Sequence, residues 1–460
     1  MKKSIYTLML PLCLAAMLFC GCDDFVETDA PNSQLVTSAV FENMTTANAA
    51  MADVYSQMRE NGLISGKPYG FSCLLGTYTD ELISYESGEY TSGDFYNNAL
   101  LPSNEYIGLL WNASYNQVYA CNAILKGAGE STALTAAQKN QLQGEALFVR
   151  ALIHFNINNV FGDIPYVEAT DYVQNSTVTR TPTVTVYQNV IRDLERAIEL
   201  LPQDYLTTDR IRPNKATAKA LLARVYLYHE MNAEASNMAS AVLNDTERYR
   251  NEPDLDKVFL KNSPATIWQL AAGAAGGNTD DAITFIFYSG PPYIAGLSET
   301  FVNQFEAGDL RKQHWIGTVT EGTTSWYYPY KYKEDLATAS SMEYTIVFRL
   351  AEQYLIRAEA RARQGELLGA KEDLNIIRHI AGLADTTAQT QAELLDAILQ
   401  ERRSELFTEQ GHRFFDLKRF GKLDAALGTK AGWNATDVLW PLPQAELLVN
   451  RFLTPQNPGY

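Results

Sequence analysis

The chain has 460 residues, of which 46% are hydrophobic, and a formal net charge of −17. The hydrophobic content is ordinary for a globular protein and is enough to build a large core. The strong negative charge argues against nucleic acid as a partner, because an acidic surface repels phosphate backbones.

The N-terminal segment has the pattern of a bacterial lipoprotein signal peptide. Two lysines follow the initiator methionine, and residues 5–19 are almost wholly apolar, a run too short to span a bilayer comfortably. Gly21 precedes Cys22, and a small residue directly before the cysteine is what a lipoprotein signal peptidase accepts. We therefore predict a signal peptide over residues 1–21, a lipid on Cys22, and a polar tether over residues 22–40. A plain secretory signal is the alternative interpretation.

Helical spacing of apolar residues marks much of the remaining chain. The clearest pattern lies within residues 138–161, where apolar residues recur at steps of three and four positions. Pro202 ends the helix predicted just before it, because proline cannot continue a helix. The predicted helices cover residues 41–61, 106–126, 138–161, 187–201, 213–230, 233–243, 345–363, 367–380 and 392–410.

Two stretches lack this helical pattern. Residues 62–101 are rich in Gly, Ser, Tyr and Asp, and we predict loops there. Residues 254–341 contain Gly-Gly, Pro-Pro and the β-branched runs TIWQL and ITFIF, which favour short strands joined by long loops. No long Pro/Ser/Gly linker interrupts the body, so we predict a single domain over residues 41–460.

Small residues recur in the two predicted helix pairs that begin at residues 213 and 345. Small side chains let antiparallel helices approach closely, which is the packing principle of tetratricopeptide-like pairs. A generic helical bundle would show the same pattern and stays open. In either case the sequence predicts an all-α fold, with tetratricopeptide-like helix pairs and long irregular insertions of loops and short strands. The recurring small residues are Ala218, Ala223, Ala358 and Ala362.

The sequence does not contain the patterns of metal, nucleotide or nucleophilic chemistry. Its five histidines lie singly, without HExxH or paired Cys/His spacing, and there is no Walker lysine or G-x-S-x-G elbow. We therefore predict no catalytic residue, no metal and no cofactor. His154 lies beside an apolar stripe and is expected simply to pack there. Cys73 and Cys121 could form a disulfide or lie buried as thiols, and the sequence leaves this open.

The most charge-dense segment is ERRSELFTEQGHRFFDLKR, residues 401–419. Apolar residues interleave its charges, so we predict a partly buried ion-pair network instead of acid–base machinery. Asp80 and Glu81 could pass for the carboxylate pair of a glycosidase, but adjacent residues rarely flank one scissile bond. We expect these two residues to be solvated loop charges or groups that bind hydroxyls.

Aromatic residues are concentrated in the two stretches that lack helical periodicity. Sugar rings have apolar C–H faces that stack on aromatic planes, while Asp and Asn bond the hydroxyls. Loops on a rigid scaffold often carry binding residues, so we predict a ligand site built jointly by the two stretches. Many of these aromatics could instead pack the loops onto the scaffold. The predicted ligand-binding residues are Tyr85, Tyr90, Tyr96, Tyr293, Trp315 and Trp326.

Five segments together resemble the SusD/RagB family. The first, GEALFVRALIHFNINNVFGDIPYV, ends in an aromatic-Gly-Asp-x-Pro turn, and the last, LWPLPQAELLVNRFLTPQNPGY, has a WP-x-P…NPGY ending. Between them lie another long helix, the best-marked helix pair and an ERR…GHR-aromatic-DLKR element. In chain order the segments are residues 144–167, 212–228, 348–383, 401–423 and 439–460.

The resemblance implies a fold of tetratricopeptide-like helix pairs with a loop-rich ligand face. It also implies a lipid-anchored protein on the surface of a Gram-negative outer membrane that captures oligosaccharide, or else peptide, and is not an enzyme. The expected partner is a SusC-like, TonB-dependent transporter, over which the lipoprotein would sit like a lid. A surface glycoside hydrolase and an adhesive scaffold without a small ligand are the remaining alternatives.

Overall fold

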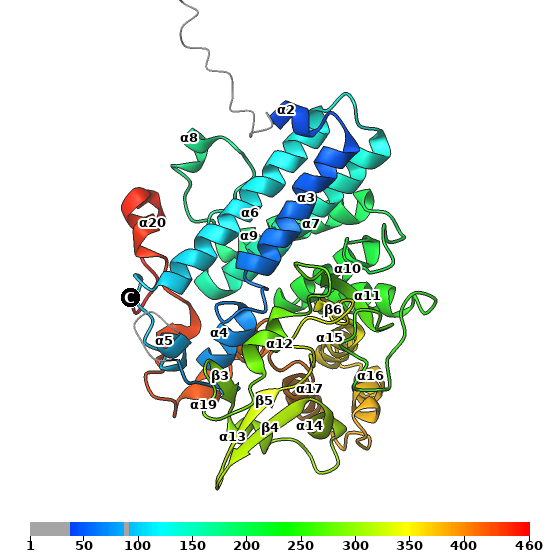
Figure 1. The fold of residues 1–460 in the computed structure, drawn as a ribbon, viewed down its shortest axis with the longest axis vertical. Coiled ribbons are helices and arrows are strands. Elements are labelled where there is room, and N and C mark those ends of the chain that lie inside the picture. The colour runs from blue at the N-terminus through cyan, green and yellow to red at the C-terminus, as the bar shows by residue number, and fades with distance from the viewer. Residues whose placement is uncertain (1–36, 87–91) are drawn as a thin grey trace, which may run out of the picture.

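The computed structural model describes residues 37–86 and 92–460 (Figure 1). It is mostly helical with a few short strands, so the predicted fold class is confirmed. The earlier helices are α2 (Thr37–Val40), α3 (Met44–Asn61), α4 (Phe71–Tyr78), α5 (Ser92–Tyr96), α6 (Glu105–Glu130), α7 (Ala136–Phe161), α8 (Tyr172–Asn175), α9 (Thr183–Leu200), α10 (Lys215–Tyr228) and α11 (Asn232–Leu243). The later helices are α12 (Asp280–Phe285), α13 (Glu299–Val302), α14 (Leu310–His314), α15 (Leu350–Arg363), α16 (Leu367–Ile380), α17 (Gln391–Glu405), α18 (His412–Arg419), α19 (Leu423–Leu427) and α20 (Gln444–Val449), with 3-10 turns η2 (Ala435–Val438) and η3 (Arg451–Leu453).

Helix α7 is the centre of the layer of long helices, and it packs against α3, α6, α9 and α10. A capping box fixes its start: the Thr135 hydroxyl accepts from the Gln138 N–H at 3.3 Å, and the Gln138 side chain accepts from the Thr135 N–H at 2.9 Å. Gly162 follows its end with φ of +73°, a conformation that favours glycine. The helix predicted over residues 138–161 is therefore confirmed, with two further residues at its start.

Because neighbours surround α7, two of its charged side chains, Glu145 and Arg150, are buried and paired. Arg150 donates to both carboxylate oxygens of Asp193 on α9, at 2.7 and 2.8 Å. Glu145 accepts from the Tyr55 hydroxyl on α3 at 2.6 Å and from Arg212 at 2.5 and 2.7 Å. Each pair joins α7 to a different part of the chain, so these contacts cross-link the helical layer.

The two predicted helix pairs are present. Helix α10 packs on α11 and α15 packs on α16, while α11 and α15 bring the two pairs together. Gly365 forms the turn between α15 and α16 with φ of +81°. The predicted close approach of the helices is confirmed by the complete burial of Ala218, Ala223, Ala358 and Ala362.

Two small antiparallel sheets complete the fold. Figure 1 shows the hairpin of β4 and β5 at the lower tip of the molecule, away from the long helices. The first sheet has the order β1-β3-β5-β4, formed by β1 (Leu82–Ser84), β3 (Ala295–Leu297), β5 (Thr324–Pro329) and β4 (Ile316–Glu321). The second pairs β2 (Thr266–Leu270) with β6 (Thr345–Arg349), which leads directly into α15.

Two segments that were predicted to be non-helical contain helices. Residues 62–101 were expected to be loops, but they contain α4, whose eight residues are all buried. A helix that is buried on every side has no polar face, so it leaves no amphipathic stripe in the sequence. The run ITFIF, expected as a strand, lies mainly in α12. The Thr279 hydroxyl caps that helix by accepting from the Ala282 N–H at 3.1 Å.

Two predicted helices were too long. The first part of residues 345–363 is strand β6, because it pairs with β2, and the helix begins only at Leu350. The segment 392–410 is helical only to Glu405. Thr408 and Gln410 then have φ of +52° and +49°, so the segment between α17 and α18 is not helical.

Three residues of uncertain role lie in the core. Cys73 and Cys121 are free, fully buried thiols, which settles the open question of pairing. His154 is also fully buried, with Nδ1 3.0 Å from the Arg150 carbonyl oxygen, so its predicted packing role is confirmed. Burial lowers the pKa of His154 to about 3, because the charged ring loses its hydration.

Candidate functional site

The four-stranded sheet brings the two predicted ligand-face stretches together. Strand β1 comes from the first stretch and pairs with β3 from the second. Tyr85 continues this ladder by donating its N–H to the Ile294 carbonyl at 2.8 Å. The Tyr85 ring lies beside Gly296, and Tyr293 is 87% exposed directly before Ile294. The sheet therefore places Tyr85 and Tyr293 on neighbouring chain segments, although more than 200 residues separate them in sequence.

Trp326 is placed by the β4–β5 hairpin and by a glycine. It lies on β5 opposite Val319 on β4. Its indole ring packs against Gly290, where an added Cβ would lie only 2.2 Å from ring carbons, so this contact requires glycine. The Gly290 N–H donates to the Glu321 carboxylate at 3.0 Å, which fixes the loop that leads to Tyr293.

Tyr96 ends α5 and lies beside a cation from the C-terminal part of the chain. The Lys430 ammonium is 4.9 Å from the centre of the Tyr96 ring and donates to the Thr79 carbonyl at 2.7 Å. Burial lowers the pKa of Lys430 to about 7. Burial and then Tyr96 raise the pKa of Tyr85. No feature of the sequence had pointed to Lys430.

A further row of aromatic side chains lies on and beside β5. The rings of Phe287 and Tyr328 are 5.0 Å apart, and those of Tyr328 and Tyr330 are 5.7 Å apart. Tyr288 is 75% exposed and donates its hydroxyl to the Asp335 carboxylate at 2.8 Å. None of these residues was among the predicted site residues. The two-residue spacing of Trp326, Tyr328 and Tyr330 could have indicated the two tyrosines, because alternate residues of a strand share one face. Phe287 and Tyr288 lie outside this strand.

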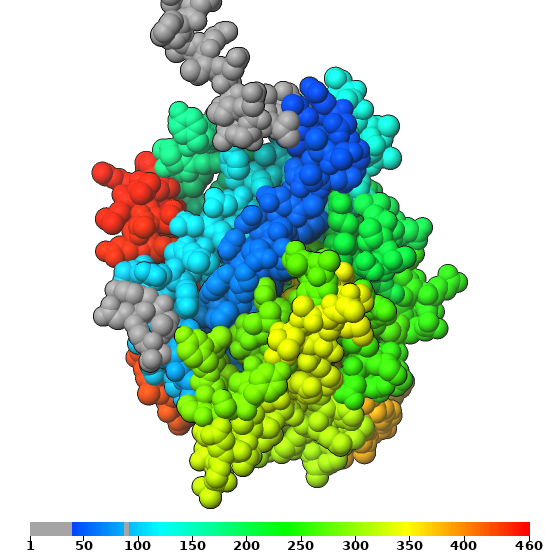
Figure 2. Space-filling view, viewed as in Figure 1, coloured from blue at the N-terminus to red at the C-terminus, as the bar shows by residue number. Residues whose placement is uncertain are grey.

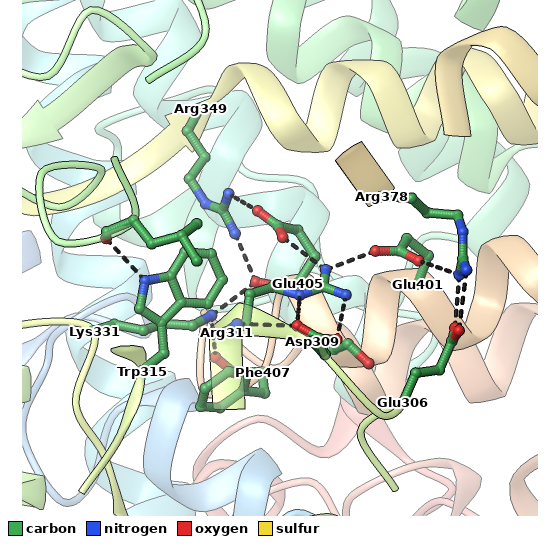
Figure 3. Close-up of polar contacts among 12 residues, drawn as sticks. Glu306, Asp309, Arg311, Trp315, Lys331, Arg349, Arg378, Glu401, Glu405 and Phe407 are labelled. Carbon is green, nitrogen blue, oxygen red and sulfur yellow. Dashed lines mark hydrogen bonds and ion pairs between the residues drawn. The ribbon is translucent and has the colours of Figure 1, made fainter. Parts of the chain in front are cut away.

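The prediction that Trp315 binds the ligand is wrong. It is 1% exposed, and its Nε1 donates to the Leu255 carbonyl at 3.0 Å (Figure 3). Its ring packs against Phe259 at 5.5 Å and lies 5.0 Å from the Lys331 ammonium. The aromatic ring therefore has no free face for a ligand, and Trp315 is a core residue.

Of the other predicted site residues, Tyr90 lies outside the described residues. Tyr85, Tyr96 and Trp326 are partly exposed and Tyr293 is strongly exposed, so these four remain predictions. Figure 2 shows the hairpin as the projecting lower tip of the molecule, which places β5 on an open surface.

A buried ion-pair network lies behind the hairpin (Figure 3). Arg311 pairs with Asp309 at 2.8 Å, Glu401 at 2.7 Å and Glu405 at 2.9 Å, and Arg349 from β6 pairs with the same Glu405. Burial alone would raise the pKa of Glu405, but the two arginines outweigh it and hold the pKa at about 2. The predicted network around ERRSELF is thus confirmed, and it ties the base of the hairpin to α17.

Asp80 and Glu81 are also structural. The Asp80 carboxylate accepts from Arg413 at 2.8 Å and from Arg403 at 2.7 Å. Glu81 is 2% exposed, and burial followed by the adjacent Asp80 raises its pKa to about 7. The prediction of solvated loop charges was therefore wrong, because arginines 323 and 333 residues away cover this pair.

Within the described part of the chain, we find no cluster of three or more His, Cys, Asp or Glu side chains arranged to hold a metal ion. In the same part, no helix has both the length and the apolar character needed to cross a bilayer.

These features define a class of protein: a helical scaffold that carries an open aromatic surface on a small sheet and its loops. Residues 24–227 match a family model described as "Starch-binding associating with outer membrane". Residues 301–460 match a second model, described as "SusD family". The chain belongs to the SusD/RagB family.

Individual relatives agree over nearly the whole length. SusD-like protein P2 of Formosa agariphila is 27% identical, across 96% of this chain and 97% of its own. A SusD superfamily protein from Bacteroides vulgatus is 22% identical with a TM-score of 0.79, across 91% of this chain and 99% of its own. A laminarin-binding SusD-like protein is 24% identical with a TM-score of 0.77, across 90% and 99%. These solved structures have the same fold.

Proposed function

We propose that the protein is a lipid-anchored, cell-surface protein of the outer membrane that binds an oligosaccharide and delivers it to a SusC-like, TonB-dependent transporter. Family membership supports this proposal, since one matching model is described as starch-binding and outer-membrane associated and one structural neighbour binds laminarin. The observation that carries the ligand site is the gathering of Tyr85, Tyr293 and Trp326 by one sheet. The laminarin-binding neighbour is named as a binding protein, which supports a function without catalysis.

The chemistry of this surface fits a sugar. Partly or strongly exposed rings supply faces for stacking on C–H groups. Carboxylates lie among them: Glu86 accepts from the Ser92 N–H at 2.9 Å, and Glu321 accepts from the Gly290 N–H at 3.0 Å. A carboxylate can accept about four hydrogen bonds, so each keeps capacity for sugar hydroxyls. A peptide is the alternative ligand within the same family.

Calorimetry on single alanine variants tests the site. Tyr85→Ala, Tyr96→Ala, Tyr293→Ala and Trp326→Ala are titrated with laminarin- and starch-derived oligosaccharides and with short peptides. Loss of a stacking ring should cost about 1–3 kcal/mol, or roughly 5- to 150-fold in affinity. Tyr172→Ala is the matched control, because Tyr172 is 82% exposed on α8, far from the hairpin (Figure 1).

Three outcomes would overturn the proposed site or function. Unchanged affinity in all four site variants would move the site elsewhere. Binding of peptides alone would replace the saccharide by a peptide ligand. Turnover of a bound oligosaccharide by the wild-type protein would exclude a function limited to binding.

The anchor is tested by Cys22→Ala, with Cys20→Ala as the matched control. Cys22 alone combines a small preceding residue with an apolar run upstream, so only its loss should release the protein from the membrane fraction. Retention of the Cys22 variant in the membrane, measured by fractionation, would contradict the anchor. Protease treatment of intact cells then tests surface exposure, and full protection would argue against it.

The partner is tested by purification from native membranes in mild detergent. We expect a large TonB-dependent transporter to co-purify with the wild-type protein in stoichiometric amount. Recovery as a free monomer in several detergents would contradict the delivery role.

A further inference from the structure

A cavity of about 1110 Å³ lies apart from the aromatic surface. The ends of α7, α10 and α15, the start of α9, helix α18 and the C-terminal residues 452–458 form its walls. None of the predicted ligand-binding residues lines this groove. Its volume is at the upper end of the range for small-molecule sites, which is enough for a few sugar rings.

Two cations on the groove wall have no carboxylate within ion-pair distance among the described residues. Lys418 donates to the carbonyls of Asn159 at 2.7 Å and Val438 at 3.0 Å. Arg180 donates to three protein oxygens at 2.6 to 2.8 Å. An ammonium has three donors and a guanidinium five, so Lys418 keeps one N–H and Arg180 two for a ligand.

Two buried polar atoms on the same wall have no hydrogen-bond partner in the described part of the protein. Asn158 is 2% exposed, and its Oδ1 accepts no hydrogen bond although its Nδ2 donates to the Gly162 carbonyl at 2.6 Å. The buried hydroxyl of Tyr228 is likewise unpaired. Solvent does not reach either atom, so both lie behind the groove surface and do not contact a ligand there directly.

The other charged residues of the groove wall are two paired arginines and two carboxylates. Arg363 and Arg419 also line it, but both pair with Glu359, at 2.8 and 2.6 Å, and add no free charge. Asp163 uses its carboxylate to accept from the Thr183 N–H at 2.8 Å. Glu230 also lines the groove, and both carboxylates keep capacity to accept from hydroxyls, so the wall offers its other two cations for an anionic group and two carboxylates for hydroxyls. The protein as a whole carries a net charge of −17, so the local positive potential of Lys418 and Arg180 is what attracts an anion to this groove.

We propose that this groove is a second binding site, for a short saccharide that carries a carboxylate. Lys418 and Arg180 bind the carboxylate, while the Asp163 and Glu230 side chains accept from hydroxyls. Tyr187 stacks on His229 with the ring centres 5.0 Å apart at 10°, which fixes the orientation of the imidazole ring on the groove wall.

The protonation of Lys418 gives the proposal a second measurable signature. Burial lowers the pKa of Lys418 to about 7, and a bound carboxylate would raise it. Binding near pH 7 therefore takes up a proton, and affinity falls as the pH rises from 6 to 9. The titratable groups that face Lys418 are Tyr187 on α9, Tyr228, His229 and Glu230 at the end of α10, Arg363 and Arg419 on α15 and α18, and Asp163 and Arg180 between α7 and α9.

Calorimetry with trigalacturonate, and with neutral galactotriose as its uncharged counterpart, tests the site. Thr179 is exposed on the groove wall, so Thr179→Glu adds a negative charge there and Thr179→Gln matches its size without charge. We expect trigalacturonate binding to weaken about tenfold in Thr179→Glu and to stay within about twofold in Thr179→Gln. Trp326→Ala should leave it unchanged, which separates this site from the aromatic surface. In His229→Gln, proton uptake measured in two buffers should persist.

Several results would overturn the proposal. The proposal is wrong if trigalacturonate does not bind at millimolar concentration or if galactotriose binds equally well. It is also wrong if the two Thr179 variants bind with equal affinity or if Trp326→Ala abolishes binding. Binding of triglutamate in place of trigalacturonate would show that the groove receives an acidic peptide, and an affinity independent of pH would exclude Lys418.

Discussion

Replacing Arg311 by methionine should destabilise the protein by about 3–5 kcal/mol. The Arg311 side chain is 1% exposed and lies 2.8, 2.7 and 2.9 Å from the carboxylates of Asp309, Glu401 and Glu405. Methionine is an apolar side chain without the charge, so it leaves three buried carboxylates without this cation. Breaking a buried ion pair from one side typically costs this amount, because the uncompensated charge stays in the core.

Urea and thermal unfolding, followed by circular dichroism, measure the loss. In a chain of this size, about 4 kcal/mol corresponds to a fall of roughly 5 °C in Tm. The matched control is Arg196→Met on α9, because Arg196 and Glu199 also form a 2.5 Å ion pair but their side chains are 57% and 65% exposed. Exposed pairs contribute about 0–1 kcal/mol, so the control should change little.

The loss from Arg311→Met should shrink as the pH falls. Burial already raises the pKa of Glu401 in the wild type, and removing the arginine raises it further. A carboxyl whose pKa is higher in the folded than in the unfolded state binds a proton on folding. As the pH falls from 8 to 5, the variant therefore gains stability relative to the wild type. A loss below about 1 kcal/mol at pH 8, or an equal loss at both pH values, would refute the reasoning.

Two other variants, Asp80→Asn and Gly290→Ala, test contacts that support the site. Asp80→Asn should cost about 2–3 kcal/mol, because Asp80 pairs with Arg403 and Arg413 while its own side chain is 22% exposed. Partial burial alone would raise the pKa of Asp80, but its arginines outweigh that effect and lower it. Its contribution is therefore present above the ordinary pKa of Asp, and denaturation at pH 3 should show a smaller difference than at pH 7. Gly290→Ala should displace the Trp326 ring, change its fluorescence and weaken ligand binding, because the new Cβ would lie 2.2 Å from the indole. The control Gly108→Ala meets nothing within 4 Å and should leave both unchanged.

The sequence predicts a helix well when the buried residues of that helix form a single face. Helix α16 was predicted over residues 367–380 and has those bounds, because its buried positions recur at helical spacing and Gly365 ends the preceding helix. Helix α4 was missed because it is buried all round. Strand β6 was taken for helix because its partner β2 lies about 80 residues earlier, and no local pattern reports such a pairing.

The same limit applies to the site. Composition identified the two aromatic stretches, and the sheet does join them. It did not distinguish Tyr293, which is 87% exposed, from Trp315, which is 1% exposed. The difference depends on long-range contacts of Trp315 with Leu255, Phe259 and Lys331, none of which has a signal in the local sequence.

The sheet that carries the aromatic surface is too small to hold it rigidly by itself. Strand β1 has three residues, and β3 meets β5 through the single pair of Leu297 and Tyr327. Backbone bonds of this number give little stability to an isolated sheet. The hairpin is instead held at its base, where Arg311 and Lys331 bond to α17 and to the carbonyls that follow it. Preorganised binding groups need such supporting contacts, so the buried network determines how well Trp326 and Tyr293 are positioned for a ligand, although neither residue touches it.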